Sequence, residues 1–151
     1  EFLRWGSIHR NTYLNFPAAL TEYGSLKHQR DVIFAGQMTG VEGYTESAAS
    51  GIIAAINLDR LMKGKDPVIP PETTVLGGMY RYLGTSDSSH FQPMNSNWGL
   101  VDPLQVRIRN KRQKREMLAK RAFEDFIAWI ASEDISPISR DYETLEVVGA
   151  S

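Results

Sequence analysis

The pattern of apolar and polar positions is clearest between residues 31 and 62. Residues 31–35 form a short, β-branched apolar run that stops at Gly36, which predicts a buried strand. Glycines at positions 36, 40 and 43 predict a loop after it. From Glu46 to about Met62, small and apolar residues occupy nearly every side, which predicts a helix packed on a sheet and ended by Gly64 and Pro67.

Two more helices are predicted downstream. The first begins at Pro70, Pro71 and Glu72, because proline and an acidic residue suit the first turn of a helix. Residues 84–104 are rich in Gly, Ser, Asn, Asp and Pro and predict an ordered loop that carries His90, Phe91 and Trp98. The second helix is expected from about residue 104 to 131, with apolar residues repeating on one face. An acidic tail follows Pro137.

Composition limits the class of protein. The 151 residues, 42% hydrophobic and 23% charged, are typical of one soluble globular unit. We find no leader and no apolar run of membrane length, so we expect a cytoplasmic protein with no membrane partner, supplied as an internal fragment. The chain has no cysteine, so it holds no disulfide, no thiolate metal site and no cysteine nucleophile, and we expect no metal.

Charge is unevenly distributed although the formal net charge is only −1. Residues 107–121, here called the basic stripe, contain eight Lys and Arg residues and one acid, Glu116. Such a stripe is either a solvated helix face or a contact for RNA phosphates, which would give affinity without sequence choice. The residues that we expect to contact RNA are Arg109, Lys111, Arg112 and Arg115.

The glycine loop before the helix at 46–62 is the best candidate for a ligand site. A helix N-terminus offers free backbone N–H groups and a positive dipole end, which attract an anionic or electron-rich group. Glycines before helices also serve tight packing, so on these residues alone both interpretations stay open.

The longer strings around this loop resemble a known family. FAGQMTGVEGYTESAASG at residues 34–51 resembles the second flavin-binding motif of the methylenetetrahydrofolate-dependent tRNA (uracil-5-)-methyltransferases, which are similar to glucose-inhibited division protein A. HRNTYLN at 9–15, PPETTVLG at 70–77 and HFQPMNSNWGL at 90–100 match the same family. The resemblance covers roughly residues 3–130.

The resemblance implies an α/β enzyme with a Rossmann-like flavin domain, of which this C-terminal fragment is mostly α-helical with a few short strands. Such an enzyme methylates uracil C5 in tRNA, at the T-loop uridine, using methylenetetrahydrofolate, FAD and NAD(P)H. In that family the dinucleotide-binding glycine loop and the catalytic cysteine precede this segment. The chain has neither, so we expect no catalytic residue in it and no activity of the fragment alone.

The resemblance also assigns roles to individual residues. It implies cofactor contacts by residues of the glycine loop and the following helix, namely Gly36, Gln37, Gly43, Tyr44, Glu46, Ser47 and Ala48. Plain N-capping is the alternative for Glu46 and Ser47, and core packing is the alternative for Tyr44. Folate or substrate contacts are expected from His9, Arg10, Asn11, His90 and Asn95, with Gln92 and Asn97 nearby. Structural hydrogen bonds are the alternative for the loop residues.

Three segments are expected: the C-terminal part of the FAD-binding domain (1–66), a helical region with the basic helix (67–135) and the acidic tail (136–151). Two other functions stay open, a sister enzyme that methylates ribosomal RNA and a noncatalytic RNA-binding module. Because a cut flavin domain leaves a strand edge and a helix face uncovered, we also expect self-association or loss of order near residues 1–50.

Overall fold

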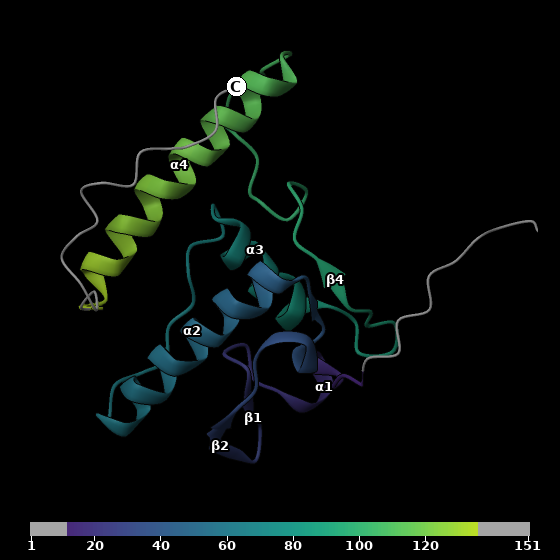
Figure 1. The fold of residues 1–151 in the computed structure, drawn as a ribbon, viewed down its shortest axis with the longest axis vertical. Helices are drawn as coiled ribbons and strands as arrows, with labels where there is room; N and C mark the ends of the chain where they lie inside the picture. The colour runs from purple at the N-terminus through teal and green to yellow at the C-terminus, as the bar shows by residue number, and fades with distance from the viewer. Residues whose placement is uncertain (1–11, 136–151) are drawn as a thin grey trace, which may run out of the picture.

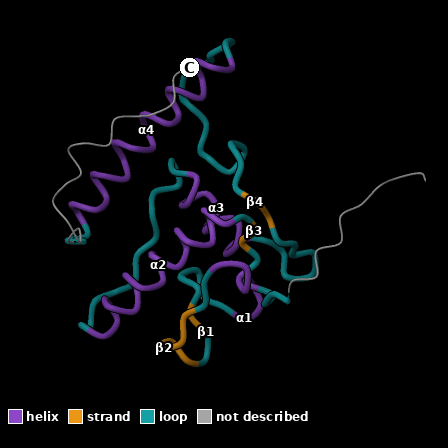
Figure 2. The backbone as a smooth tube through the Cα atoms, viewed as in Figure 1, coloured by secondary structure: helices purple, strands orange, loops and turns teal. Residues whose placement is uncertain are grey.

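The computed structural model describes residues 12–135. In this part of the chain, helices dominate and the strands are short, as Figure 2 shows, which confirms the mostly α-helical prediction. The elements in chain order are α1 (Phe16–Ala19), β1 (Ser25–Leu26), β2 (Gln29–Ile33), the 3-10 helix η1 (Gly36–Thr39), β3 (Val41–Glu42), α2 (Tyr44–Met62), α3 (Val75–Thr85), β4 (Met94–Asn95) and α4 (Lys111–Ser132).

The hydrophobic core lies where α1, β3, α3 and the loop after α3 meet (Figure 1). Its fully buried members come from distant parts of the sequence, so packing them fixes the loops between the helices. Burying such a side chain contributes roughly 1.5–3 kcal/mol relative to leaving it in water. The buried cluster consists of Phe16, Leu20, Val41, Met79, Leu83 and Phe91.

The strand expected at residues 31–35 lies two residues earlier and is not buried. β2 pairs antiparallel with β1 in a two-stranded sheet, and Leu26 is opposite Gln29 in the register. The first three residues of β2 are exposed, while Val32 and Ile33 are half-buried. A strand becomes fully buried when its sheet is covered on both faces, and this hairpin is too small for that.

The predicted helix at 46–62 is present as α2, and it begins two residues earlier, after Gly43. Its C-terminal end has the hydrogen bonds of a Schellman motif. The Lys65 N–H donates to the Arg60 carbonyl at 2.8 Å, and the Gly64 N–H donates to the Leu61 carbonyl at 3.0 Å. Gly64 has φ of 69°, a left-handed conformation that favours glycine. The prediction that Gly64 ends this helix is therefore confirmed.

The helix expected from Pro70 begins five residues later, at Val75. Thr74 is its N-cap, because the Thr74 hydroxyl accepts a hydrogen bond from the Gly77 N–H at 2.9 Å. The Pro71 carbonyl accepts from the Thr74 N–H at 2.8 Å, which makes a turn before the helix. The two prolines therefore precede α3 and lie outside its first turn.

The last helix also begins later than expected, at Lys111 instead of about residue 104. Asn110 is its N-cap, and the Asn110 side chain accepts hydrogen bonds from the Arg112 and Gln113 N–H groups at 2.9 and 3.1 Å. Residues 104–110 are irregular. Arg107 and Arg109 therefore lie in the segment that leads into α4, and the rest of the basic stripe lies on the helix.

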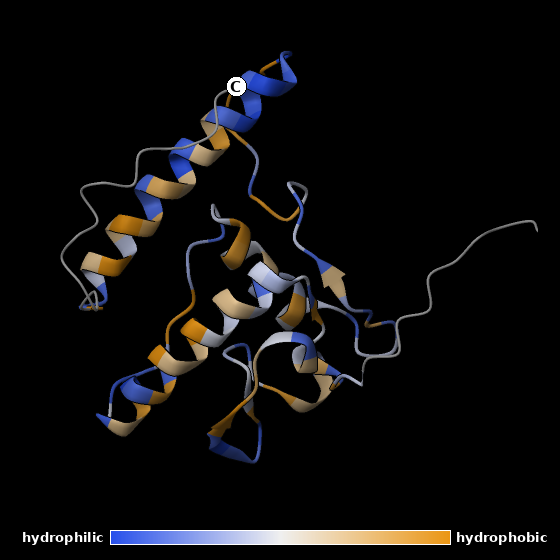
Figure 3. Ribbon diagram, in the orientation of Figure 1, coloured by the Kyte–Doolittle hydropathy of each residue, from blue (hydrophilic) through white to orange (hydrophobic). Residues whose placement is uncertain are grey.

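α4 stands apart from the other elements (Figure 1). Among its residues only Leu118 is buried. Phe123 and Ile127, which belong to the apolar repeat of this helix, keep 63% and 46% of their surface exposed. Figure 3 shows that the helix changes from hydrophilic near its start to more apolar toward its end. The amphipathic pattern is present, and within the described residues its apolar face is covered only in part, since Phe126 and Ile130 are half-buried.

Candidate functional site

Two strings that are far apart in the sequence meet at a short parallel sheet. β3 pairs with β4 so that Val41 is opposite Met94 and Glu42 is opposite Asn95. The Met94 N–H also donates to the Gly40 carbonyl at 2.9 Å. The glycine loop at 36–43 and the loop at 90–100 therefore form one structural unit at the N-terminal end of α2, and we take this unit as the candidate site.

The three glycines of the loop all have positive φ: 67° at Gly36, 84° at Gly40 and 95° at Gly43. At Gly40 close packing adds to this requirement, because a Cβ atom would lie 2.7 Å from Cζ of Phe91. At Gly43 an added Cβ would collide with the Glu46 carboxylate. Positive φ favours glycine at all three positions, and close approach to the buried Phe91 ring adds to this requirement at Gly40.

Glu46 closes the N-terminal end of α2. Its carboxylate accepts hydrogen bonds from the Ser96 hydroxyl and from backbone N–H groups, including its own. These bonds hold the pKa of Glu46 below its ordinary value, and the bond from the Ser96 hydroxyl has the largest effect. The carboxylate is consequently ionised at neutral pH, and a second anion at this helix end would meet its negative charge.

The serines of α2 attach the loop to the helix. The Gly36 N–H donates to the Ser50 hydroxyl at 2.8 Å, and this hydroxyl donates to the Ser47 carbonyl at 2.8 Å. The Ser50 carbonyl accepts from the hydroxyl of Tyr80 on α3 at 3.4 Å. Burial raises the pKa of Tyr80, so its hydroxyl stays protonated and able to donate. Gly36 and Ser47 thus have structural partners already.

Three of the expected cofactor-binding residues face solvent. Gln37 and Ala48 are exposed, and Tyr44 keeps 93% of its surface accessible. Core packing as the explanation for Tyr44 is therefore wrong for the described residues. These three side chains are therefore accessible to a ligand.

The expected folate or substrate residues do not all come together. Asn95 lies in β4, and its amide donates to Glu42 Oε2 at 3.3 Å, so it borders the candidate site. His90 is exposed and has its partners in its own loop, with Nδ1 3.1 Å from Asp87 and 2.8 Å from the Ser89 hydroxyl. His9, Arg10 and Asn11 lie outside the described residues.

The neighbouring loop residues have structural contacts. The Asn97 side chain accepts from the Gly99 N–H at 2.9 Å, and the Gln92 carbonyl accepts from the Tyr82 hydroxyl at 2.8 Å. These bonds shape the loop in the way that the structural alternative expects.

The basic stripe divides into free and engaged cations. All four expected RNA contacts, Arg109, Lys111, Arg112 and Arg115, are exposed. Arg112 forms an ion pair with Glu116 at 2.9 Å within the helix. Arg121, at the other end of the stripe, donates to the Asp102 and Pro103 carbonyls and therefore attaches α4 to the preceding loop.

Sequence reasoning missed the arginine that organises the loop before α4. Arg81 on α3 pairs with Glu72 and Asp102, both at 2.5 Å, and donates to the Leu100 carbonyl at 2.8 Å. The Asp102 carboxylate, followed by Glu72, raises the pKa of Arg81. The guanidinium group of Arg81 therefore joins α3 to the turn at Glu72 and to the loop at 100–102. The spacing of Glu72, Arg81 and Asp102 along the sequence matches no motif, so it did not indicate that they form ion pairs.

Ser96 was also missed, although it lies inside the string at 90–100. Only the pairing of β3 with β4 brings it to Glu46.

In the part of the chain that the structure describes, no group of three or more His, Asp and Glu side chains is arranged to hold a metal ion. None of the helices in residues 12–135 has the length and apolar character needed to cross a membrane.

Comparison with known proteins agrees with the string matches. A family model described as glucose inhibited division protein A matches residues 1–66. The chain is 49% identical over 124 residues to the methylenetetrahydrofolate–tRNA-(uracil-5-)-methyltransferase TrmFO of Bacillus cytotoxicus, covering 82% of this chain and 29% of the relative. This chain belongs to the glucose-inhibited-division-protein-A-like family.

Other members of the family that carry the same name give similar values. The TrmFO of Brevibacillus brevis is 52% identical over 124 residues, which is 82% of this chain and 28% of that protein. The TrmFO of Lacticaseibacillus paracasei is 48% identical over 131 residues, which is 87% of this chain and 30% of that protein. The chain therefore spans less than a third of the length of these relatives.

Proposed function

We propose that this chain is part of a flavoenzyme that methylates uracil C5 in tRNA, at the T-loop uridine. Methylenetetrahydrofolate is the proposed carbon donor, reduced FAD the reductant and NAD(P)H the source of electrons. The observation that carries the proposal is the identity of about half the residues to TrmFO proteins, over a stretch long enough to include both the glycine loop and the loop at 90–100, which β3 and β4 join.

The residues present fit one part of FAD better than another. The ionised carboxylate of Glu46 caps the end of α2, so a pyrophosphate there would be repelled. The exposed ring of Tyr44, the amide of Gln37 and the close backbone at Gly43 suit the isoalloxazine ring or the ribityl chain. Reduced flavin supplies electrons when bound, while these residues orient the ring and exclude water from one of its edges.

The remaining site residues extend this proposal. Asn95 borders the glycine loop and is the better placed of the two described folate or substrate candidates, and His90 is proposed to contact the folate or the RNA from the adjoining loop. The roles of Gly36, Ser47 and Ala48 at the flavin and of His9, Arg10 and Asn11 at the folate remain proposals. The same holds for the three segments 1–66, 67–135 and 136–151 and for a cytoplasmic location.

The basic stripe supports an RNA substrate. Arg109, Lys111 and Arg115 are exposed, and none of the described carboxylates forms an ion pair with them. Each cation that neutralises a phosphate releases counterions, so binding should weaken as salt rises. We propose that these three residues contact the RNA backbone and that Arg112 contributes less, because Glu116 competes for its guanidinium.

A chimera tests the proposal. The Bacillus subtilis TrmFO, 48% identical over 124 residues, would carry this chain in place of its matching segment. We expect the purified chimera to show bound-flavin absorbance and to methylate an unmodified tRNA transcript. Replacing Gln37 and Tyr44 by alanine should weaken flavin binding, whereas Arg30→Ala, an exposed site in the β1–β2 hairpin, should not.

The outcomes separate the functions. Methylation of a ribosomal RNA fragment but not of tRNA would favour the sister activity. A folded chimera that holds no flavin contradicts the assignment of residues 36–48 to the cofactor. Binding of RNA by a chimera that is flavin-free and inactive would favour a noncatalytic RNA-binding module.

A further inference from the structure

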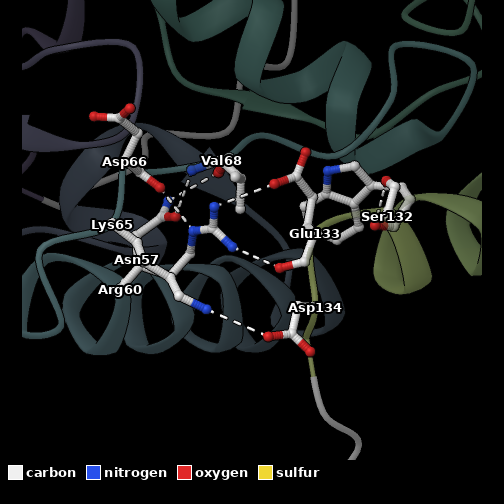
Figure 4. Close-up of polar contacts among 9 residues, drawn as sticks. Asn57, Arg60, Lys65, Asp66, Val68, Ser132, Glu133 and Asp134 are labelled. Carbon is white, nitrogen blue, oxygen red and sulfur yellow. Dashed lines mark hydrogen bonds and ion pairs between the residues drawn. The ribbon is translucent and has the colours of Figure 1, made fainter.

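α4 is attached to the rest of the protein at two places. Near its middle, Leu118 is 3% exposed, and Arg121 donates to the Asp102 and Pro103 carbonyls. At its C-terminal end, Arg60 of α2 contacts Glu133 (Figure 4). Between these points exposed residues alternate with half-buried ones, and residues 111–117 are all exposed.

The Arg60 side chain uses its whole guanidinium group. Its Nε donates to the Asp66 carbonyl at 2.7 Å, Nη1 donates to the Glu133 carbonyl at 2.7 Å, and Nη2 pairs with Glu133 Oε2 at 3.1 Å. Only 13% of the Arg60 side chain and 33% of the Glu133 side chain are exposed. The two terminal nitrogens of the planar Arg60 guanidinium group bind the carbonyl oxygen and the carboxylate of Glu133. This two-point contact fixes the orientation of Glu133 as well as its distance.

Arg60 is itself rigidly held. Its backbone carbonyl accepts the Lys65 N–H in the Schellman motif. One turn earlier the Asn57 side chain, which is fully buried, exchanges two hydrogen bonds of 3.0 and 2.8 Å with the backbone of Val68. The Lys65–Asp134 pair at 3.3 Å adds to the contact, but its side chains are more exposed, so it contributes less.

We propose that Arg60 is a positioning residue that sets the direction of α4 and thereby aligns the basic stripe with the flavin end of α2. Arg121 is the pivot. At a rise of about 1.5 Å per residue, Glu133 lies about 18 Å from the pivot on one side and Lys111 lies about 15 Å on the other. Rotation of about 20° would displace the basic end by about 5 Å.

This inference rests on the proposed function, because alignment matters only if the basic stripe binds RNA. The Gly43 end of α2 lies at the candidate flavin site, and the Arg60 end holds α4. One helix therefore joins both. RNA held by the stripe would then enter the site from a defined direction, which lowers the orientational cost of binding.

The absence of cysteine makes a distance measurement straightforward. Spin labels would be placed on Ala55→Cys in α2 and Gln113→Cys in the basic stripe, both at exposed positions, and an excess of unlabelled chain would be added so that only distances within one molecule are measured. We expect a narrow distance distribution in the otherwise unchanged chain. Arg60→Gln should broaden it, and Arg60→Lys should broaden it as well, because lysine keeps the charge but loses the fork.

Two further variants serve as controls. Glu133→Gln removes the charge but keeps the Glu133 carbonyl, so broadening should be smaller. Lys63→Gln removes a cation from the same end of α2, which among the described residues pairs with Asp59 alone, at 2.7 Å, and it should leave the distribution unchanged. Circular dichroism should give equal helix content for all variants. A narrow distribution in Arg60→Gln would overturn the proposal.

RNA affinity gives the second measurement. If α4 keeps its direction in about a fifth of Arg60→Gln molecules, the apparent Kd for a tRNA transcript rises about five-fold. Weaker binding without broadening would mean that Arg60 contacts RNA directly, and broadening without a change in Kd would also overturn the aligning role. If the unchanged chain binds no RNA while Arg60→Gln still broadens the distances, the proposed RNA function fails and Arg60 remains only the attachment of α4.

Discussion

Glu46 has two structural roles, one at the start of α2 and one in the contact with the loop at 90–100. Its carboxylate accepts its own backbone N–H in the first turn of α2 and stabilises the positive end of the helix, an effect worth about 0.3–1 kcal/mol at exposed sites. The same carboxylate binds Ser96 and so holds the loop at 90–100 against the glycine loop. Capping at this position is therefore part of how the candidate site is built.

This arrangement predicts a pH dependence for Ser96→Ala. The Ser96 hydroxyl is the largest cause of the lowered pKa of Glu46, so its removal should raise that pKa toward 4.5. A folded-state pKa below the unfolded value stabilises the protein above the unfolded pKa, and this contribution is lost as pH falls through the folded pKa. The stability difference between Ser96→Ala and the unchanged chain should therefore be present at pH 7 and shrink below about pH 4.5.

Carboxyl titration by NMR and urea unfolding between pH 3 and 7 would measure both effects. Ser88→Ala, an exposed change in the neighbouring loop, is the control and should leave the titration of Glu46 unchanged. An unchanged Glu46 titration in Ser96→Ala would contradict the assigned hydrogen bond.

At the scale of elements, capping residues decide where the helices begin. The apolar pattern correctly predicted α2 and the apolar repeat of α4. It did not predict the first residue of α3 or α4, because Thr74 and Asn110 accept the first N–H groups and stop the helix there. Thr and Asn are preferred N-cap residues, so at these two helices the capping residue determines the first turn more directly than proline or periodicity does.

The candidate site was only partly predictable. The glycine loop and the start of α2 followed from local pattern and resemblance, since the residues are adjacent in sequence. The pairing of β3 with β4 involves two residues on each side, which is too short to leave a periodic signal. Ser96, Arg81 and Arg60 act through contacts with distant segments, so their roles became visible only in three dimensions.

Two helical glycines should respond in opposite ways to alanine. Gly51 in α2 has nothing within 4 Å of an added Cβ, so Gly51→Ala should stabilise the protein by about 0.5–1 kcal/mol through helix propensity. Gly77 in α3 lies against the Pro70 and Pro71 carbonyls, which an added Cβ would overlap. Gly77→Ala should therefore cost about 2–3 kcal/mol despite the same gain in propensity.

Urea unfolding followed by circular dichroism would measure both changes. The two variants are controls for each other, because each replaces a helical glycine with the same residue. Equal stabilisation by both would mean that α3 does not pack against the two prolines as described.

At the scale of the whole molecule, α2 presents an uncovered apolar stripe. Tyr44, Ile52 and Met62 keep 93%, 63% and 81% of their surfaces exposed. Ala48 and Ala55 are also exposed, and Figure 3 shows the pale and apolar colours along this helix. Contiguous apolar surface of this kind favours contact with another protein surface.

The chain by itself is therefore expected to self-associate as its concentration rises. Ile52→Lys together with Met62→Lys should shift it toward the monomer, because two charges would then have to be desolvated in the contact. Sedimentation velocity over a range of concentrations would measure this. Lys63→Ala, a change at an already polar position of α2, should have little effect, and a monomer at every concentration would contradict the expectation.

The β3–β4 pairing has a consequence for the order in which the protein forms. Glu42 and its partner Asn95 are 53 positions apart, and a ribosome adds roughly 5–20 residues per second. About 3–10 seconds therefore pass between synthesis of the glycine loop and synthesis of the strand that completes it. During that interval α2 and the hairpin can form from local contacts, whereas the hydrogen bond between Ser96 and Glu46 cannot form until Ser96 has been synthesised. The candidate site is accordingly completed after α2 and the hairpin have formed, and before α4 can attach through Glu133.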